Sequence, residues 1–287
     1  MNTLKKIRQF FEYLVFLLVY IFISIFPLTI ASKIIGTLMV FISVFLRRKD
    51  RVKKQLIQYM NYDGANTSPT IRKIYYHFGQ NIGELMMMKS FIKRQKLFDF
   101  PKISKANKIG NIYVTAHFSN WEMVGLPFYF ENKKAAFVYR HVSNPYIDKF
   151  ILKRRSLIYT GGCYEKFKTS SNELENLLLE GIDVVILCDQ KWLKGIKLEF
   201  LGHETTSMVI PAVLSLRTGA NIHMLKVNRE INSHYNFELE QLNYTKDKDN
   251  DITILNIMTN IHNIYSRWIK SNPSEWWLWT HEKWKSE

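Results

Sequence analysis

The sequence predicts an α/β protein, with a mixed sheet flanked by helices behind an N-terminal hydrophobic membrane-anchor helix. Short runs rich in β-branched and aromatic residues alternate with helical segments along most of the chain. Near the N-terminus, Tyr13 to Ser32 is 20 residues long and has no charge, which is the length of a membrane-spanning helix. Hydrophobic residues make up 47% of the chain, so a large core is expected and global disorder is excluded.

The anchor region is expected to cover residues 1–50, and the catalytic domain residues 51–287. Pro27 interrupts the uncharged run, which a membrane helix tolerates with some risk of a kink. A second uncharged run, Ile34 to Leu46, is too short to span a bilayer. The first run, Tyr13 to Ser32, is too long for the apolar core of a cleaved signal peptide, and no small-residue cleavage site follows it. A buried core helix is the remaining alternative.

The topology of the anchor stays open because basic residues lie on both sides of it. They are Lys5, Lys6 and Arg8 before the uncharged run, and Arg47, Arg48, Lys49, Arg51, Lys53 and Lys54 after it. The positive-inside rule draws both flanks to the cytoplasm. The segment could therefore span the membrane with one flank on the unfavoured side, re-enter, or lie on the surface.

The first elements of the catalytic domain lead to a polar turn. Arg72 to Lys93 is expected to be a helix, and Asn111 to Ala116 is a short β-rich run. His117 to Asn120 follows as a turn, and Asn120 is a good N-cap for a helix that begins at Trp121.

The remaining elements continue the alternation of strands and helices. Strands are expected at Ala135–Tyr139, Ile182–Cys188, Asn221–Val227 and Tyr235–Leu242. Helices are expected at Pro145–Arg155, with Pro at its start, at Glu173–Glu180 and Val209–Thr218, each followed by Gly, and at Ile252–Lys270.

The charge and the cysteines narrow the class of protein. The formal net charge is +15, which suits either nucleic acid or an anionic membrane with an anionic substrate. The basic residues form no single dense tract, and zinc-finger and RNP-like motifs are absent from the sequence, so nucleic acid is disfavoured. Cys163 and Cys188 are the two cysteines, too few for a disulfide scaffold or a structural zinc site.

The candidate chemistry lies in the segment Thr115-Ala116-His117-Phe118-Ser119-Asn120-Trp121-Glu122. A hydroxyl that attacks a carbonyl needs a base to remove its proton, and His117 is the candidate because histidine as a residue type has a pKa near neutrality. A carboxylate on the other ring nitrogen would fix the tautomer, and Glu122 is the nearest candidate. One such pair is also what chance gives, so a His and a Glu that merely border a turn are the alternative.

Several ordered blocks resemble the late acyltransferases of lipid A biosynthesis, within the wider lysophospholipid acyltransferase group. The blocks are the anchor followed by Arg47-Arg48-Lys49, HFSNWE from His117 to Glu122, VYRHVSNPYIDKFILKRR from Val138 to Arg155, ILCDQK around Asp189 and Gln190, EFLGHETTSMVIPAVLSLRTGANI from Glu199 to Ile222, and PSEWWLWTHEKWK from Pro273 to Lys285. They cover nearly the whole chain. Ser119 departs from the family, in which many relatives carry Gly, and so does the segment Glu199 to Gly202.

The resemblance implies a glycerolipid-acyltransferase-like fold and an enzyme of the bacterial inner membrane with its catalytic domain on the cytoplasmic face. His117 would be the base and Glu122 its partner, and the backbone near Ser119 to Trp121 is a candidate for stabilising the oxyanion. Substrate would be bound by Asn120, Arg140, Arg154, Arg155 and Asp189. Acyl carrier protein would be the acyl donor and a membrane glycolipid the acceptor.

Some alternatives stay open at this stage. Arg154 and Arg155 could be a solvated helix end that faces lipid head groups, and Asp189 could pair within the fold. No metal or cofactor is expected besides the acyl-thioester co-substrate. The acceptor could be a phospholipid, aminolipid or mannolipid, with acyl-coenzyme A as donor. A non-catalytic protein that binds anionic lipids is the rival from another class.

Overall fold

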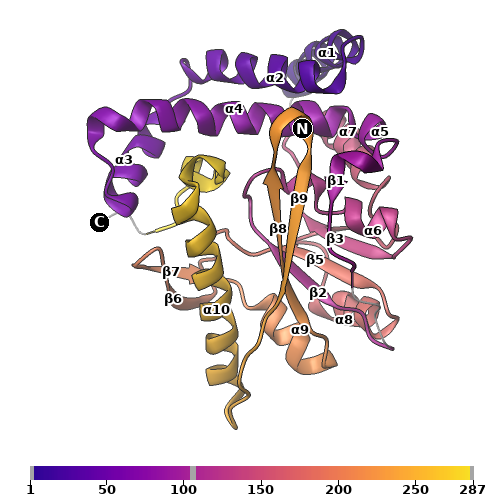
Figure 1. Cartoon of the computed structure of the whole chain (residues 1–287), viewed down its shortest axis with the longest axis vertical. Coiled ribbons are helices and arrows are strands. Elements are labelled where there is room, and N and C mark those ends of the chain that lie inside the picture. Colours follow the sequence, from indigo (N-terminus) through magenta and orange to yellow (C-terminus); the bar gives the residue numbers. More distant parts are fainter. Residues whose placement is uncertain (1–2, 104–107, 285–287) are drawn as a thin grey trace.

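A seven-stranded mixed sheet forms the centre of the computed structural model, which describes residues 3–103 and 108–284 (Figure 1). The strand order is β1-β9-β8-β2-β5-β3-β4. The strands are β1 (Phe98–Asp99), β2 (Ile112–Thr115), β3 (Ala135–Tyr139), β4 (Gly162–Glu165), β5 (Asp183–Leu187), β8 (Ile222–Arg229) and β9 (Tyr235–Gln241). A separate hairpin consists of β6 (Ile196–Phe200) and β7 (His203–Ser207).

The centre of the sheet is parallel, with β2 between β5 and β8. Every residue of β2 and of β5 is buried, as expected for parallel strands covered on both faces. Alternate side chains enter two hydrophobic clusters: Val114 and Ile186 lie in one, Tyr113 and Val185 in the other. The register pairs Thr115 with Leu187, so the carboxyl ends of β2 and β5 are level.

Ten α-helices are assigned among the described residues. They are α1 (Thr3–Ser24), α2 (Leu28–Ser43), α3 (Arg48–Met60), α4 (Thr67–Met86), α5 (Met88–Phe91), α6 (Leu126–Phe130), α7 (Pro145–Arg155), α8 (Ser171–Leu179), α9 (Ile210–Thr218) and α10 (Asn250–Ser271). Short 3-10 turns are η1 (Gly64–Asn66), η2 (Gln95–Leu97), η3 (Trp121–Met123), η4 (Ile231–Ser233), η5 (Pro273–Glu275) and η6 (Trp277–Thr280).

The helix α4 separates the N-terminal helices from the sheet. Figure 1 shows α2 and α4 side by side at one end of the molecule, with the sheet beneath them. The two helices approach closely because Gly79 and Gly83 on α4 face Ile35 and Gly36 on α2. A Cβ on Gly79 would lie 2.5 Å from the backbone oxygen of Ile35, so this packing requires glycine there.

The predicted α/β class is confirmed, and most predicted elements are present. The bounds of β3 and α7 agree with the predicted ranges Ala135–Tyr139 and Pro145–Arg155. The helix predicted at Arg72–Lys93 begins earlier and ends at Met86. The helix predicted from Trp121 is a 3-10 turn followed by α6. The β4 strand and the β6–β7 hairpin were not predicted.

The predicted N-terminal apolar helix is confirmed, but its bounds differ: the run Tyr13 to Ser32 is divided, because Ser24 ends α1 and Pro27 precedes α2. Proline fixes its own φ and disfavours helix in the residue before it, which accounts for the break. Among the described residues, α1 is the one helix long and apolar enough to cross a membrane. The helices α2 and α3 meet at 92°. The division into two domains at residue 50 stays a prediction.

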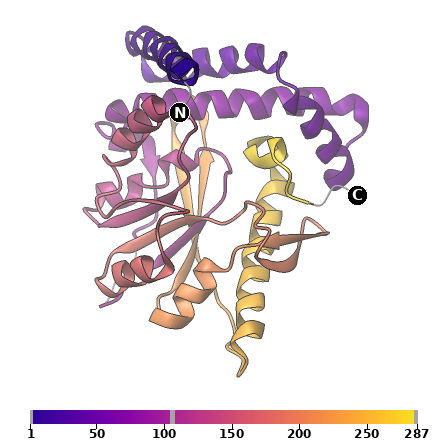
Figure 2. The same cartoon turned by 180° about the vertical axis from the view of Figure 1, so that it is seen from behind.

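The described chain ends in a segment that crosses the carboxyl edge of the central strands. Figure 2 shows α10 beside the sheet, with this segment at the upper end of the helix, where Trp276 pairs with Phe118 just beyond β2. We call residues 273–284 the C-terminal strap. Its Trp276 and Trp279 are fully buried, so these tryptophans belong to the core rather than to the surface. Lys285, the last residue of the corresponding sequence block, lies outside the described residues.

Candidate active site

His117 lies two residues beyond the buried strand β2, and the backbone around it is fixed from two sides. Tyr265 of α10 donates a hydrogen bond from its hydroxyl to the carbonyl of Thr115 at 2.6 Å. The carbonyl of His117 accepts one from the amide of Trp277 in the strap at 2.9 Å. The imidazole is partly exposed, with 17% of the side chain accessible. The ring is therefore held on a rigid support and still reaches the surface of a cavity.

Asp189 orients this imidazole. It lies two residues beyond β5, the strand beside β2, and its side chain is fully buried. Asp189 Oδ1 lies 2.8 Å from His117 Nδ1, and Oδ2 accepts a hydrogen bond from the His117 amide at 2.7 Å. One carboxylate thus holds both the ring and the backbone of the histidine.

The electrostatics of Asp189 decide the histidine tautomer. Burial alone raises the pKa of this carboxyl, but the charge of His117 and three donated hydrogen bonds outweigh burial and lower it to about 2. The third donor is Trp276 Nε1, at 2.9 Å from Oδ2. An ionised carboxylate can only accept, so Nδ1 of His117 carries the proton and donates it to Asp189. The lone pair of the neutral imidazole is therefore on Nε2, where a base would need it.

The expected pairing of His117 with Glu122 is wrong. Glu122 is buried, and both of its oxygens accept hydrogen bonds from Arg155: Nε to Oε2 at 2.8 Å and Nη2 to Oε1 at 2.6 Å. Burial lowers the pKa of Arg155, but Glu122 more than compensates and raises it. The 3-10 turn after Asn120 directs Glu122 toward the end of α7, while the parallel register brings Asp189 to His117.

The turn between His117 and Glu122 is closed by residues from distant parts of the chain. Ser119 has φ of 50°, in the left-handed region that favours glycine. Its carbonyl accepts a hydrogen bond from Asn81 Nδ2 on α4 at 2.6 Å, and its amide donates to the carbonyl of Glu275 at 2.9 Å. The Ser119 amide is therefore engaged, which removes one of the expected oxyanion donors.

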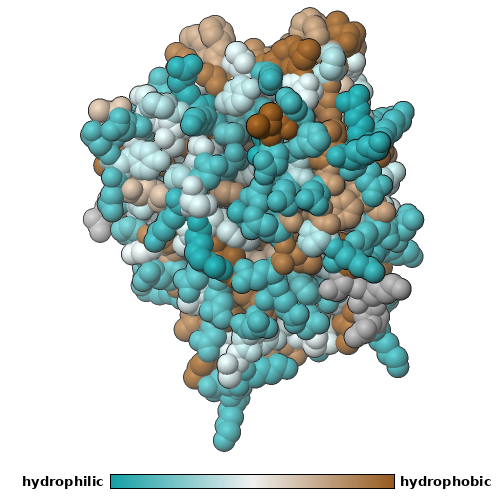
Figure 3. All heavy atoms as spheres, in the orientation of Figure 1, coloured by the Kyte–Doolittle hydropathy of each residue, from teal (hydrophilic) through white to brown (hydrophobic). Residues whose placement is uncertain are grey.

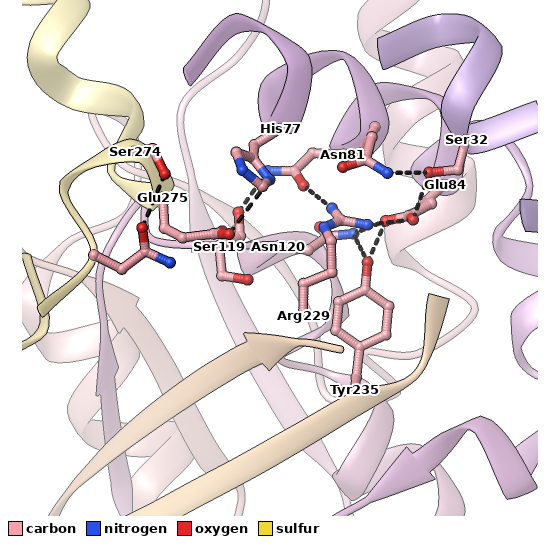
Figure 4. A network of polar contacts seen from close by, with 12 residues as sticks. Ser32, His77, Asn81, Glu84, Ser119, Asn120, Arg229, Tyr235, Ser274 and Glu275 are labelled. Carbon is pink, nitrogen blue, oxygen red and sulfur yellow. Dashed lines mark hydrogen bonds and ion pairs between the residues drawn. The ribbon is translucent and has the colours of Figure 1, made fainter. Parts of the chain in front are cut away.

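Asn120 belongs to a buried polar network rather than to a substrate surface (Figure 4). Its Nδ2 donates to Glu84 Oε2 at 2.6 Å, and Glu84, which is fully buried on α4, also accepts from Tyr235 and Arg229. Ser32 of α2 donates to the same carboxylate at 2.8 Å. The expectation that Asn120 binds substrate is corrected: it fixes the turn to α4 and β9.

The other predicted substrate residues divide into two groups. Arg154 is buried between helices, where Nε donates to the carbonyl of Met86 at 3.2 Å and Nη2 to the hydroxyl of Tyr20 at 3.0 Å. It is not among the residues that line the cavity beside His117, and neither is Asp189. Arg140 and Arg155 do line that cavity. The structure thus brings His117, Arg140 and Arg155 together.

The cavity beside His117 has a volume of about 230 Å³. Apolar side chains form much of its wall, among them Phe137, Leu174, Ile186, Leu187, Met208 and Ile210. Four cationic side chains also line it: Arg140, Arg155, Lys166 and Lys194. A ligand that combines an apolar chain with an anionic group would find both kinds of surface next to the histidine.

One nitrogen of the Arg155 guanidinium has no hydrogen-bond partner among the described residues. Its Nε and Nη2 are engaged by Glu122, and its Nη1 is buried without a hydrogen-bond partner among the described residues. Phe137 and Tyr139 lie beneath the guanidinium, with ring centroids 5.3 and 5.7 Å from Cζ. The ion pair with Glu122 and these rings hold the guanidinium in one orientation at the cavity wall.

Sequence reasoning missed the residues that support the histidine from a distance. Trp276 and Glu275 were read only as part of an aromatic C-terminal block, and Asn81 and Glu84 only as part of a helix. The signal that could have found Glu84 is an acidic residue between Gly83 and the apolar residues Leu85 and Met86 at the end of a helix, since a buried carboxylate needs partners.

The fold and the site define an α/β enzyme built around a histidine that is oriented by a buried carboxylate at the carboxyl end of the sheet. The chain belongs to the bacterial lipid A biosynthesis acyltransferase family, whose model matches residues 2–286. The resemblance found in the sequence blocks is therefore confirmed, and the chain is an acyltransferase of lipid A biosynthesis. No curated protein sequence matches it.

Proposed function

We propose that this enzyme transfers a fatty acyl chain from an acyl carrier protein thioester to a hydroxyl of a lipid A precursor, with His117 as the general base. The observation that carries this proposal is the position of the imidazole. His117 is paired through Nδ1 with Asp189 and lines a cavity with apolar walls and cationic residues. The acyl chain would occupy the apolar part, and phosphate groups of donor or acceptor would meet Arg140 and Lys166.

The reaction proceeds in two proton transfers. His117 Nε2 removes the proton of the acceptor hydroxyl while its oxygen attacks the thioester carbonyl carbon. The oxyanion that forms needs a donor. Arg155 is the candidate, because it lines the cavity and its buried Nη1 has no hydrogen-bond partner among the described residues. When the tetrahedral intermediate collapses, the C–S bond breaks and the thiolate takes the proton from the imidazolium. The products are an ester and a free thiol.

Asp189 and Glu122 act through other residues in this proposal. Asp189 keeps the proton on Nδ1 and stabilises the imidazolium, because its charge is buried 2.8 Å from the ring nitrogen. Glu122 keeps Arg155 extended and correctly aligned through two hydrogen bonds. The reaction as written needs no metal or cofactor besides the thioester co-substrate.

The test is acyl transfer by the detergent-solubilised full-length protein. Acyl carrier protein and coenzyme A thioesters are offered with a tetra-acylated lipid A precursor or a lysophospholipid. We expect transfer from the acyl carrier protein to the lipid A precursor, and a 10²- to 10⁴-fold loss in His117→Ala, as is typical for loss of a general base. His234→Ala is the matched control, because His234 is exposed and lies outside the cavity.

Each outcome bears on one part of the proposal. Transfer to the lysophospholipid alone would support the mechanism, but it would show that the acceptor is another membrane lipid and not a lipid A precursor. Transfer from coenzyme A alone would change the donor. Equal rates in His117→Ala and wild type would refute the role of the histidine. A folded protein without transfer to either acceptor would favour the non-catalytic reading, in which the chain binds anionic lipids.

A further inference from the structure

The helix α1 has two different faces along its whole length. Its outward face carries exposed apolar residues every seven residues, or about two turns, with 73% of Leu4, 61% of Phe11 and 67% of Leu18 accessible. Its inward face bears Gln9, which is buried, and Tyr20. Apart from Gln9 this inward face is mostly aromatic and apolar, with Phe16, Tyr20 and the buried Ile23 packed against the rest of the protein. The helix α1 therefore presents only one apolar face to lipid, as a helix that lies on a membrane surface does.

The inward face is fixed to α7 by polar contacts that lie far apart on α1. Near its start, Gln9 Nε2 donates to the carbonyl of Ser143 at 2.9 Å, and Asn144 Nδ2 donates to the carbonyl of Gln9 at 2.7 Å. Eleven residues later, or about 16 Å along the helix, the hydroxyl of Tyr20 accepts a hydrogen bond from Arg154. The two helices therefore run side by side over about half the thickness of a bilayer core.

Aromatic pairs fill the space between these two polar contacts. Tyr13 stacks on Tyr146 with centroids 5.6 Å apart, and Phe16 packs edge-on against Phe150 at 5.1 Å. The contact of α1 with α7 is thus continuous from Gln9 to Tyr20. Wherever this stretch of α1 lies relative to a bilayer, α7 lies there too.

The composition of α7 makes a membrane-crossing α1 costly. Lys149 and Lys153 on α7 are exposed, and each would enter the hydrocarbon beside α1 if α1 ran through it. A lysine at the bilayer centre costs about 2.5–3.5 kcal/mol on insertion scales. Keeping α7 in water would instead require the hydrogen bonds of Gln9 and Tyr20 to break.

The helix α2 lies at the same end of the molecule and also has an exposed apolar surface. Phe41 near its end is 65% accessible, and Phe45 just beyond it is 74% accessible. In both cartoon views α1 is strongly foreshortened and α2 runs across the page, so both helices lie across the long axis of the molecule (Figures 1 and 2). Figure 3 shows hydrophobic side chains gathered at this end.

Basic residues border this apolar end on two sides. Lys5 and Lys6 are exposed at the start of α1, Lys33 is exposed on α2, and Arg47 and Arg48 are exposed at the start of α3. Anionic head groups attract these residues, and each cation near the membrane surface contributes about 1 kcal/mol to binding. A flat arrangement also resolves the conflict of the positive-inside rule, because both basic flanks then stay on one side.

We propose that α1 and α2 lie flat in the interface of an anionic bilayer, with their apolar faces in one leaflet, and that α1 does not cross the membrane. The protein is then held on a single face of the membrane by an L-shaped pair of helices broken at Pro27. The inference does not depend on the acyl donor or acceptor, since it rests on the contacts of α1 with α7 and on the exposed faces of α1 and α2.

The test is the bilayer depth of Leu4, Phe11 and Leu18, each replaced in turn by cysteine and spin-labelled in the full-length protein. Neighbouring positions are about 10 Å apart along the helix axis. Every labelled variant also carries Cys163→Ser, so that this native cysteine is not labelled. Cys188 stays in place, because it is fully buried and burial raises the pKa of its thiol. Vesicles contain phosphatidylcholine, with or without phosphatidylglycerol.

In a flat arrangement, the three labels lie at the same depth within about 5 Å, just below the head groups. Depths that change by about 10 Å from one position to the next would show a spanning helix and overturn the proposal. Labels in water at all three positions would overturn it as well. Leu193→Cys is the control, because Leu193 is 83% accessible and far from α1 in sequence, and its label should stay in water.

A second measurement addresses the same proposal from outside the bilayer. Lys5→Cys is labelled with a membrane-impermeant maleimide in inverted and in right-side-out vesicles, next to Asp247→Cys in the exposed loop before α10. We expect both positions to react from the same side, and phosphatidylglycerol to increase binding. Reaction of the two positions from opposite sides would refute the flat arrangement. Neither measurement requires acyl transfer, so failure here is distinct from failure of the proposed function.

Discussion

Glu122 and Arg155 form a buried ion pair with two hydrogen bonds, and His117 takes no part in it. The acidic residue next to the histidine in sequence therefore serves the arginine, while the acidic residue that serves the histidine comes from the next strand of the sheet. The two carboxylates can therefore be tested separately, Glu122 through Arg155 and Asp189 through His117.

Removing the charge of Glu122 should destabilise the protein and impair transfer. Glu122→Gln leaves the buried guanidinium of Arg155 without its counter-ion, and breaking one side of a buried pair typically costs about 3–5 kcal/mol. The double variant Glu122→Met, Arg155→Met should lose less stability than Glu122→Gln, although it should be inactive. Thermal unfolding and acyl transfer of the wild type and the two variants check this. A double variant less stable than Glu122→Gln would contradict it.

Replacing Asp189 should lower the rate without removing the histidine. Asp189→Asn presents an amide to His117 Nδ1, which favours the wrong tautomer, and a loss of about 10²- to 10⁴-fold in kcat is expected. The loss should fall on kcat with little change in KM, because Asp189 does not line the cavity. A variant with normal kcat would show that the pair is merely structural.

The same carboxylate should make stability depend on pH in acid. The folded pKa of Asp189 is lowered to about 2, below the usual value of about 3.9. The stability that the ionised Asp189 carboxylate contributes is therefore complete above pH 4 and is lost as the pH falls toward 2. The difference in Tm between wild type and Asp189→Asn should shrink over that interval. A constant difference from pH 5 to pH 2 would argue against a depressed pKa.

Ser119 should tolerate glycine better than alanine. Its φ of 50° disfavours any residue with a Cβ, at a cost of roughly 1–2 kcal/mol. Both Ser119→Gly and Ser119→Ala remove the buried hydroxyl, so the difference between them isolates the backbone. We expect the glycine variant to be more stable by about 1 kcal/mol, as measured by chemical denaturation. Equal stabilities would mean that the turn has relaxed.

Arg140 should affect substrate binding rather than chemistry. It is exposed and lines the cavity, with Phe167 5.6 Å from its Cζ. Arg140→Ala should raise KM by about tenfold for phosphate-bearing substrates, since a charge-assisted hydrogen bond is worth about 1.5–3 kcal/mol. The control is Arg217→Ala on α9, outside the cavity. A change in kcat alone would place Arg140 in a different role.

The class of fold and the position of the histidine could be predicted because both depend on local pattern. A buried β-rich run followed by a polar turn predicted the end of β2 and His117 correctly. The partner of His117 could not be read from sequence distance, because strand order decides which carboxylate arrives beside it. Asp189 is 72 residues away and reaches His117 through the β2–β5 pairing.

Other residues could be placed only once tertiary contacts were known. Arg154 and Arg155 are adjacent and chemically identical, yet one is bonded to Tyr20 and the other to Glu122. The rotation of 100° per residue along α7 separates them, and no local signal says which face meets the cavity. Likewise, the strap reaches Asp189 through Trp276 only because it folds back over the sheet.

The adjacency of Arg154 and Arg155 has a practical consequence for purification. Arg154 is held by Tyr20 and Phe150, at the seam between α1 and α7, and Arg155 is the next residue along the same helical turn. A detergent that competes for this aromatic seam loosens the residue directly before the one at the cavity wall. Preparations in nanodiscs should therefore keep more activity than preparations in short-chain detergents, even when both are equally monodisperse.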